Sequence, residues 1–270
     1  MFGFTEEQIR RYARHIVLPQ LGGKGQRKLL DSRVLVVGVG GLGSPVSLYL
    51  AAAGVGTIGL VDNDVVDVSN LQRQIVHRND NVGKPKAASA AETLRALNPD
   101  VKVVLHQVTF SSANAMELVA GYDLVVECSD NFPSKYLSND ACVLASKPLV
   151  WGAVFQFDGQ MSVVLPRRGP CYRCIFPTPP PPGSVPTCVE AGVLGALVGV
   201  VGSWQALEAI KLLAGMGEPL VGRLLILDGL NATADMIEVK RRSDCALCSE
   251  HPAISELIDY ETFCGLRSTT

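Results

Sequence analysis

The sequence predicts an α/β fold built on a doubly wound, mostly parallel β-sheet. Two observations predict it. Short, uninterrupted apolar runs such as 34–37 and 57–61 are typical of strands buried on both faces. These runs alternate with longer stretches that have helical character, which is the order of a parallel sheet with helical crossovers. The 270 residues are 47 % hydrophobic and 19 % charged, which is enough apolar material for a large core.

The individual elements follow from local signals. Thr5 and Gln8 have the spacing of a capping box, so a helix is expected from there to about Val17, ahead of Pro19. A helix at 84–97 is expected to end before Asn98-Pro99. Further helices are expected from the glycines after residue 37 to about 53 and at 132–145. The remaining strands are expected at 101–105, 124–127, 149–154, 161–165, 223–227 and 235–240.

The second half of the chain changes in character. The segment from Pro166 to Pro186 contains eight prolines, so it is expected to be a long surface loop, of the kind that often binds a ligand or closes over one. After it, residues 191–207 carry no charge, which is the short limit for a membrane span. Because polar residues interrupt this run, we interpret it as a buried helix at a candidate subunit contact. The last two strands then form a C-terminal antiparallel extension of the sheet.

Charge and cysteine usage narrow the class of protein. The net charge is −2, from 24 basic and 26 acidic residues, which argues against a nucleic-acid binder that works by bulk electrostatics. The first ten residues have no basic region followed by an apolar stretch, so a cytoplasmic protein is expected. In that compartment the eight cysteines point to metal binding or catalysis rather than to disulfides.

A glycine-rich loop follows the first predicted strand and opens a helix. Gly38, Gly40 and Gly43 fit the pattern G-x-G-x-x-G, and Gly41 lies within it. Glycine allows a tight turn close to phosphate, and the helix N-terminus offers free N–H groups. Asp62 ends the next strand, where an acid can accept hydrogen bonds from ribose hydroxyls. A Rossmann-like nucleotide site is predicted, with a dinucleotide and ATP both open as ligands.

Other polar residues follow predicted strands or begin helices, at the edge of an open α/β sheet that carries the ligand. Arg73 and Lys86 are candidates to straddle a triphosphate, and Asp130 is a candidate to hold Mg²⁺. A nicotinamide dehydrogenase needs neither these cations nor a metal ligand for a triphosphate. The alternative makes the two cations solvated helix charges and Asp130 an N-cap. The same segments also contain Asn70, Gln74 and Asn131.

Two C-x-x-C pairs indicate a metal site. Cys171 and Cys174 form one pair, and Cys245 and Cys248 form the other, with 70 residues between them. Four thiolates in two such pairs suit a tetrahedral, structural Zn²⁺. A redox motif explains one pair but not two. Removal of the metal is then expected to loosen both the proline-rich segment and the C-terminal tail.

Cys188 stands apart from these pairs, just before a predicted helix. A helix N-terminus lowers the pKa of a thiol, so Cys188 is a candidate nucleophile toward an activated carbonyl. The alternative is a small buried apolar residue. No role is assigned to Cys128, Cys142 or Cys264.

Taken together, these motifs resemble the MoeB/ThiF family, the bacterial relatives of ubiquitin-activating enzymes. The resemblance covers nearly the whole chain and includes Arg11 to Ile16 and Thr187 to Gly192 in addition to the motifs above. It implies a single unit over 1–270, with a nucleotide-binding half at 1–165. The half at 166–270 would carry the zinc, the carrier-binding surface and the dimer contact.

The resemblance also implies a reaction. The C-terminal Gly-Gly carboxylate of a ubiquitin-fold sulfur-carrier protein attacks the α-phosphate of ATP, and sulfur later displaces AMP to leave a thiocarboxylate. Asp130 would hold Mg²⁺, Arg73 and Lys86 the phosphates, Asp62 the ribose, and Asn70 a phosphate or the metal. Sulfur is expected from a separate protein. The pathway, whether molybdopterin, thiamine or tRNA thiolation, stays open.

Three further residues depend on the resemblance. Family members are homodimers in which an arginine matching Arg14 enters the partner's site. The family usually has an arginine where this chain has Lys135, which keeps the charge but lacks the planar, bidentate group, so no direct role is carried over to this position. The cysteine matching Cys188 links covalently to the carrier in one branch of the family and is dispensable in the other. Two other functions stay as alternatives: an NAD(P)-dependent oxidoreductase, and a non-catalytic zinc-bearing module that binds a ubiquitin-fold protein.

Overall fold

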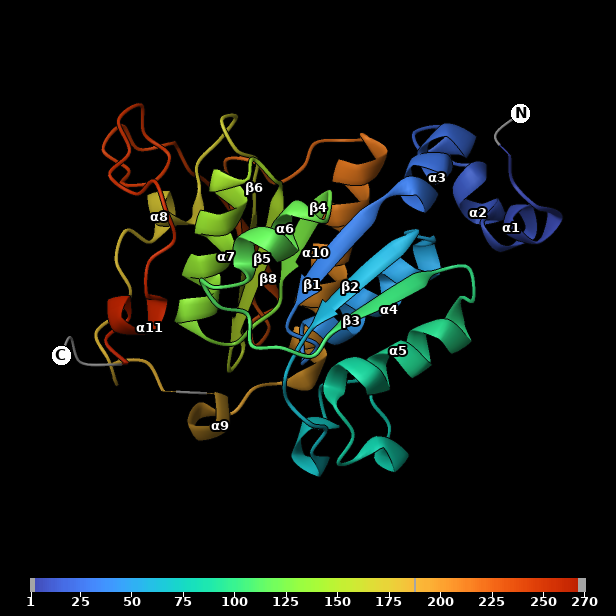
Figure 1. The fold of residues 1–270 in the computed structure, drawn as a ribbon, viewed down its shortest axis with the longest axis horizontal. Helices are drawn as coiled ribbons and strands as arrows, with labels where there is room; N and C mark the ends of the chain where they lie inside the picture. Colours follow the sequence, from blue (N-terminus) through green and yellow to red (C-terminus); the bar gives the residue numbers. More distant parts are fainter. Residues whose placement is uncertain (1–2, 187, 267–270) are drawn as a thin grey trace.

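One continuous sheet organises the molecule. The computed structural model describes residues 3–186 and 188–266, and within them eight strands pair in the order β3-β2-β1-β4-β5-β6-β7-β8 (Figure 1). The strands are β1 (Arg33–Val37), β2 (Thr57–Val61), β3 (Lys102–His106), β4 (Leu124–Glu127), β5 (Leu149–Phe155), β6 (Asp158–Val164), β7 (Arg223–Asp228) and β8 (Thr233–Glu238). The pairs among β1 to β5 are parallel, and β6, β7 and β8 add antiparallel strands. The predicted fold class is therefore confirmed.

Helices cover both faces of the sheet. The helices packed against the sheet include α3 (Gly22–Asp31), α4 (Gly43–Ala53), α5 (Lys86–Leu97), α6 (Ala115–Ala120), α7 (Phe132–Leu144) and α10 (Gly195–Ala214). Short turns of helix complete the chain at α1 (Glu6–Arg11), α2 (Ala13–Ile16), α8 (Tyr172–Ile175), α9 (Cys188–Ala191) and α11 (Tyr260–Phe263). The helices α1 and α11 lie at opposite ends of the molecule (Figure 1).

Each face of the sheet has its own hydrophobic core. Side chains alternate along β1, so Val34 and Val36 pack with α3, α4, α5 and α10 on one face. Leu35 and Val37 pack on the other face with α6, α7, α8 and α11. Burial on both faces explains why these strands appear in the sequence as continuous apolar runs.

The order in which strands are added to the sheet reverses at β1, although β1 and β4 are parallel. The chain builds β1, β2 and β3 outward in one direction and then returns to place β4 on the other side of β1. Loops that follow two such strands diverge and leave a crevice at their carboxyl ends, where ligands bind in open α/β sheets. The loops after β1 and β4 carry the predicted glycines and Asp130.

The apolar run after the proline-rich segment forms α10. It packs against α3, α4, β5 and β6, and Gly202 allows close approach to α4, since a Cβ there would lie 2.5 Å from Pro45 Cγ. Among the described residues, α10 is the helix long and apolar enough to cross a bilayer. It is only partly buried: Val201 and Ala206 pack into the core, whereas Val200 and Leu207 are exposed.

Several boundaries differ from the expectation. The first predicted helix is broken at Tyr12, whose ψ of 14° ends α1 before α2 begins. The capping box at Thr5 and Gln8 is confirmed. The helices α3 and α6 were not predicted. The proline-rich segment is mostly irregular, as expected, but contains the single turn of α8.

Candidate active site and metal centre

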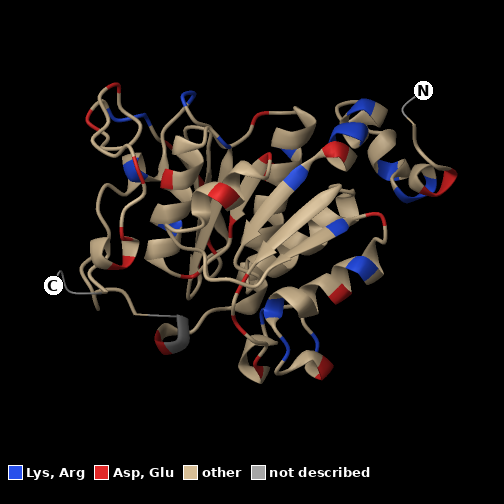
Figure 2. Ribbon diagram, in the orientation of Figure 1, with Lys and Arg blue, Asp and Glu red and all other residues tan. Residues whose placement is uncertain are grey.

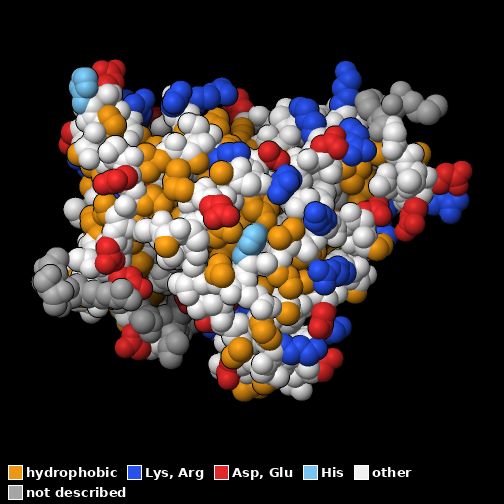
Figure 3. Space-filling view, in the orientation of Figure 1, with side chains coloured by type: hydrophobic (Ala, Val, Ile, Leu, Met, Phe, Trp, Pro, Cys, Tyr) orange, Lys and Arg blue, Asp and Glu red, His pale blue; other side chains and the backbone are white. Residues whose placement is uncertain are grey.

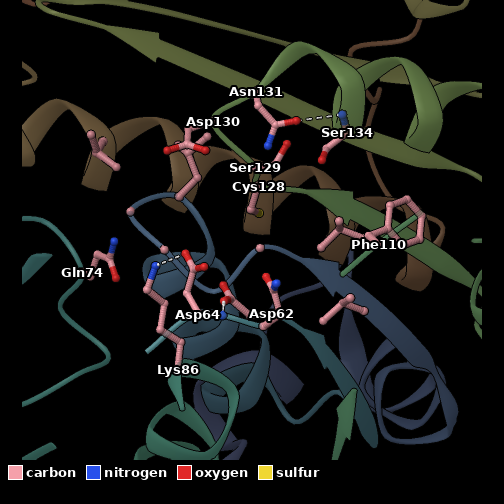
Figure 4. Close-up of a pocket in the computed structure, with 18 of the residues that line it drawn as sticks. Asp62, Asp64, Gln74, Lys86, Phe110, Cys128, Ser129, Asp130, Asn131 and Ser134 are labelled. Carbon is pink, nitrogen blue, oxygen red and sulfur yellow. Dashed lines mark hydrogen bonds and ion pairs between the residues drawn. The ribbon is translucent and has the colours of Figure 1, made fainter. Parts of the chain in front are cut away.

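A pocket with a volume of about 220 Å³ lies at the crevice between β1 and β4. The glycine loop forms one wall, and the turn after β4 forms another (Figure 4). Among the predicted site residues, the pocket is lined by Gly38, Gly40, Gly41, Asp62, Arg73, Gln74, Lys86, Asp130 and Asn131. Residues from five separate segments of the chain are thus brought together.

The glycine loop turns sharply from β1 into α4. Gly38 has a φ of +88°, which favours glycine strongly. Gly43 does not line the pocket. A Cβ at Gly43 would lie 2.1 Å from the carbonyl oxygen of Gly38, so this glycine allows the helix to start against the end of the strand. The predicted loop is therefore present, with different tasks for its glycines.

Asp62 braces the glycine loop from the next strand. Its carboxylate accepts the N–H of Val39 at 2.7 Å and the N–H of Asp64 at 2.9 Å. Burial raises the pKa of Asp62, and the two N–H groups and the nearby charge of Lys86 partly oppose this rise. An acid at this position fixes the loop and still faces the pocket, where a ribose hydroxyl can reach its free lone pairs.

Lys86 points into the pocket from the start of α5 and pairs with an acid that the sequence reading missed. Its Nζ lies 2.8 Å from Asp64 Oδ2 (Figure 4). The lysine side chain is 10 % exposed and that of Asp64 is 64 % exposed. A mostly buried ammonium with one exposed partner is available to an anionic ligand. The sequence does contain a signal for this acid, because Asp64 lies only two residues after Asp62, following the same strand.

The segment after β2 carries Arg73 and Gln74. Arg73 donates from Nη1 to the carbonyl of Ser69 at 3.1 Å. Gln74 is buried, and its Oε1 has no partner among the described residues. Asn70 is not one of the lining residues, because its Oδ1 accepts the N–H of Asp67 and closes the turn that precedes them.

A buried histidine that the sequence reading did not select joins three of these segments. His77 follows the turn that carries Arg73 and Gln74. Its Nε2 lies 3.0 Å from the carbonyl oxygen of Val39, and its Nδ1 lies 2.9 Å from Ser89 Oγ on α5. Burial lowers the pKa of His77, and the charge of Lys86 adds to this effect. A neutral imidazole thus ties the glycine loop to the helix that bears Lys86.

The turn after β4 presents Asp130 to the pocket. Asn131 is the N-cap of α7, since its Oδ1 accepts the N–H of Ser134 at 2.9 Å (Figure 4). The alternative interpretation of Asp130 as the N-cap is therefore wrong. Asp130 is exposed and makes no hydrogen bond within the part of the chain that the structure describes. Its carboxylate lies across the pocket from Asp62 and Lys86 (Figure 4).

A second, larger cavity of about 1310 Å³ adjoins the first. Its walls are mostly apolar and include Phe155, Phe176 and the prolines 179–182 and 186 of the proline-rich segment. Ser129, Asp130, Asn131 and Val154 line both cavities. The two cavities therefore meet at the turn that carries Asp130.

The four cysteines of the C-x-x-C pairs form one cluster. The Sγ atoms of Cys171 and Cys245 lie 3.6 Å apart, and those of Cys174 and Cys248 lie 3.4 Å apart. All four Sγ atoms lie within 4.8 Å of one another. Tetrahedral bonds of about 2.3 Å to zinc place sulfurs about 3.8 Å apart, so the donor set fits one Zn²⁺ with no open position.

The first cysteine pair is fastened to α7 by a buried ion pair. Arg173 lies between the two cysteines, and its Nε and Nη2 donate to the carboxylate of Asp140 at 2.9 and 2.7 Å. Tyr260 of α11 donates its hydroxyl to the same carboxylate at 2.7 Å. These contacts join residues 33 and 120 positions apart, which no local pattern reveals.

Arg14 and Cys188 lie apart from this geometry. Arg14 is an exposed residue of α2 and does not line the pocket. In Figure 2, basic residues gather on the helices at that end of the molecule, and Figure 3 shows them on the surface beside apolar side chains. The side chain of Cys188 lies outside the described residues, so its role stays a prediction.

Comparison with known proteins decides the family. Residues 12–247 match the sequence profile of the ThiF family. The chain belongs to the ThiF family. This ThiF-family chain is 53 % identical to a sulfur carrier protein adenylyltransferase of Thermus thermophilus, over 98 % of this chain and 99 % of the relative. It is 50 % identical to the adenylyltransferase and sulfurtransferase MOCS3 of Drosophila sechellia, over 98 % of this chain and 59 % of that longer protein.

Solved structures support the same fold. The crystal structure of E. coli MccB with MccA-N7isoASN has a TM-score of 0.81 at 22 % identity, over 92 % of this chain and 76 % of that one. A structure of E. coli MccB with ATP has a TM-score of 0.79 at 22 % identity, over 92 % and 75 %. The relatives named adenylyltransferase favour neither an oxidoreductase nor a non-catalytic binding module for this ThiF-family chain.

Proposed function

We propose that this chain is an ATP-dependent adenylyltransferase that activates the C-terminal carboxylate of a ubiquitin-fold sulfur-carrier protein. The observation that carries the proposal is the meeting of two cavities at Asp130, one of them bordered by a glycine loop and the other by apolar walls. A reaction between a nucleotide and a peptide terminus needs two such spaces with one shared point. The names of the relatives agree with this chemistry.

The smaller cavity is the proposed ATP site. The N–H groups of the glycine loop and the start of α4 face the phosphates, and Asp62 accepts hydrogen bonds from the ribose. Arg73 and Lys86 neutralise the triphosphate, with Lys86 exchanging its contact to Asp64 for phosphate oxygens. Each charged hydrogen bond contributes on the order of 1.5–3 kcal/mol.

The larger cavity is the proposed site of the carrier's C-terminal tail. A tail that ends in Gly-Gly has no side chains at its last two residues, so its backbone can approach the proline-lined wall closely. The terminal carboxylate would reach the shared turn beside Asp130.

Asp130 is the proposed ligand of Mg²⁺, which binds carboxylate and phosphate oxygens and neutralises charge on the triphosphate. A carboxylate is a weak nucleophile, so the protein's part is to position it and to offset the negative charges. The tail oxygen bonds to the α-phosphorus of ATP as the bond from that phosphorus to the bridging oxygen breaks. The products are an acyl-adenylate and pyrophosphate.

The remaining proposals concern partners and metal. The four-cysteine cluster would hold a structural Zn²⁺ and so tie residues 166–270 together. A homodimer would supply Arg14 to the partner's site as a permanently charged, planar group. A separate protein would supply the sulfur that displaces AMP, with Cys188 as a candidate relay. A carrier of molybdopterin, thiamine or tRNA-thiolation synthesis fits this chemistry equally.

Exchange of label between pyrophosphate and ATP tests the proposal. We expect exchange that requires Mg²⁺ and a carrier protein ending in Gly-Gly, and that disappears when the last glycine of the carrier is removed. No exchange with any such carrier from the same genome would reject the proposed function.

A further inference from the structure

Lys135 has a buried ammonium group with no hydrogen-bonding capacity left for a ligand. The residue is 6 % exposed. Its Nζ lies 2.6 Å from Glu127 Oε2, 2.9 Å from the carbonyl oxygen of Ser129 and 2.7 Å from that of Gly152. An ammonium group has three N–H bonds, and three acceptors occupy them. Although Lys135 borders the larger cavity, all three of its N–H groups donate to acceptors of the protein itself.

The same network holds the residue that precedes Asp130. Glu127 ends β4, and its Oε1 accepts both the N–H of Ser129, at 2.8 Å, and the Ser129 hydroxyl. Lys135 binds the other carboxylate oxygen and the Ser129 carbonyl. Ser129 is therefore fixed at its N–H, its carbonyl and its hydroxyl. A residue bonded at three points leaves the next residue, Asp130, little freedom at its backbone.

The third contact of Lys135 reaches the wall of the larger cavity. Gly152 lies in β5, next to Ala153 and Val154, which line that cavity. Gln205 of α10 packs against Gly152, where a Cβ would lie 2.7 Å from Gln205 Cδ, and donates to the carbonyl of Glu127 at 2.9 Å. The ammonium thus joins the Asp130 turn to the strand beside the carrier tail.

We propose that Lys135 is a positioning residue that fixes Asp130 at the junction of the two cavities and does not itself contact ATP or the carrier. This inference rests on the proposed adenylation. Burial of Glu127 and Lys135 in direct contact is what lets one side chain set the turn, because a buried pair with every donor and acceptor satisfied rigidifies its surroundings.

Three variants test this proposal. Lys135→Met removes the ammonium and keeps the length of the side chain, but leaves the buried Glu127 carboxylate unpaired. The double variant Glu127→Gln/Lys135→Met removes both charges and so avoids that penalty. Lys211→Met is the matched control, because Lys211 Nζ binds the buried Glu208 carboxylate at 2.6 Å and a backbone carbonyl at 2.8 Å outside both cavities.

The kinetic readout separates positioning from substrate contact. We expect the double variant to melt near the wild-type temperature, to lose at least tenfold in kcat of ATP–pyrophosphate exchange, and to keep the KM values for ATP and carrier within threefold. Lys211→Met keeps wild-type kinetics. An unchanged kcat in the double variant, or a rise in either KM with kcat retained, would overturn the proposal.

A second readout does not depend on activity. Amide hydrogen exchange of the peptide 128–134 is expected to accelerate in the double variant and to stay unchanged in Lys211→Met, because the contact from Lys135 Nζ to the Ser129 carbonyl is lost only in the double variant. If wild-type protein catalyses no exchange of pyrophosphate, the proposed function fails, and hydrogen exchange still decides whether Lys135 fixes the turn. Equal protection of 128–134 in all variants rejects the positioning role.

Discussion

At the scale of single residues, Asp130 and Asn131 have different roles: Asn131 caps α7, and the Asp130 carboxylate remains exposed at the pocket. Asparagine caps α7 as well as aspartate does, so the helix needs no contribution from its neighbour. Asp130 is therefore left with an exposed carboxylate at the edge of two cavities. The sequence left Asp130 open as a metal ligand or as the N-cap, and the hydrogen bond from Ser134 to Asn131 assigns the cap to its neighbour.

The first prediction is that Asp130→Ala abolishes catalysis without affecting the fold. The exposed carboxylate makes no contact within the described residues that stabilises the protein. We expect ATP–pyrophosphate exchange to fall by about 10²–10³, the usual loss for a group that stabilises developing charge. The melting temperature is expected to stay within 2 °C or so of the wild type. Glu117→Ala, at an exposed position of α6, is the control, and near-normal exchange by Asp130→Ala contradicts the assignment.

The second prediction concerns the pH dependence of stability through His77. Burial lowers the pKa of His77 in the folded protein, so the unfolded chain binds its proton more readily. The stabilisation is present above the ordinary histidine pKa of about 6.5 and is lost as the pH falls toward the lowered value. We expect the free energy of unfolding to drop more between pH 7.5 and 5.5 in wild-type protein than in His77→Gln, by urea titration. Parallel losses in the two proteins would contradict this prediction.

At the scale of elements, the sequence located the parallel strands more accurately than the rest of the fold. The predicted strands at 57–61 and 124–127 coincide with β2 and β4, because short, mostly apolar runs of this length are typical of strands buried on both faces of a sheet. The helix α3 was missed because it begins with Gly22-Gly23 and contains Gly25, residues that disfavour a helix. Its packing against α10 overrides that preference.

The candidate site was predictable only where it depends on local motifs. The glycine loop, Asp62, Lys86 and the four cysteines follow from spacing. The contacts of His77, and the contact of Lys135 with Gly152, join residues far apart in the chain, and local sequence patterns give no sign of such pairs. Asp140 and Arg173, 33 positions apart, escaped for the same reason.

The third prediction is that zinc holds the C-terminal region in place. We expect one Zn²⁺ per chain, and less in Cys245→Ser. Loss of a structural zinc removes several kcal/mol, and the melting temperature is expected to fall by about 10 °C or more. Hydrogen exchange should accelerate in 171–176 and 260–266, which meet at Asp140, while β2 serves as an internal control. Unchanged protection after chelation would show that the metal has no such role.

At the scale of the whole molecule, the exposed position of Arg14 bears on whether the proposed active site is formed by one chain or by two. Arg14 is absent from the lining of the pocket in a single chain. In the proposed homodimer, each active site combines Asp130 from one chain with Arg14 from the partner. A mixture of two inactive variants distinguishes this arrangement from action within one chain.

The fourth prediction is complementation between Arg14→Ala and Asp130→Ala. Random pairing makes half of the dimers mixed, and each mixed dimer has one site with both native residues. About a quarter of wild-type exchange activity is then expected after the variants are mixed and allowed to exchange subunits. The variants assayed separately serve as controls. A mixture as inactive as its components would exclude action across the dimer.

The junction of the two cavities has a consequence for the order in which substrates bind and products leave. In the proposed arrangement ATP and the carrier tail lie in different cavities, which share the turn 129–131 and Val154 of β5. Occupation of one cavity leaves most of the lining of the other free, so both substrates can be present before any bond changes. Double-reciprocal plots for pyrophosphate formation should therefore intersect, as in a ternary-complex mechanism, and parallel lines would indicate that one product leaves before the second substrate enters.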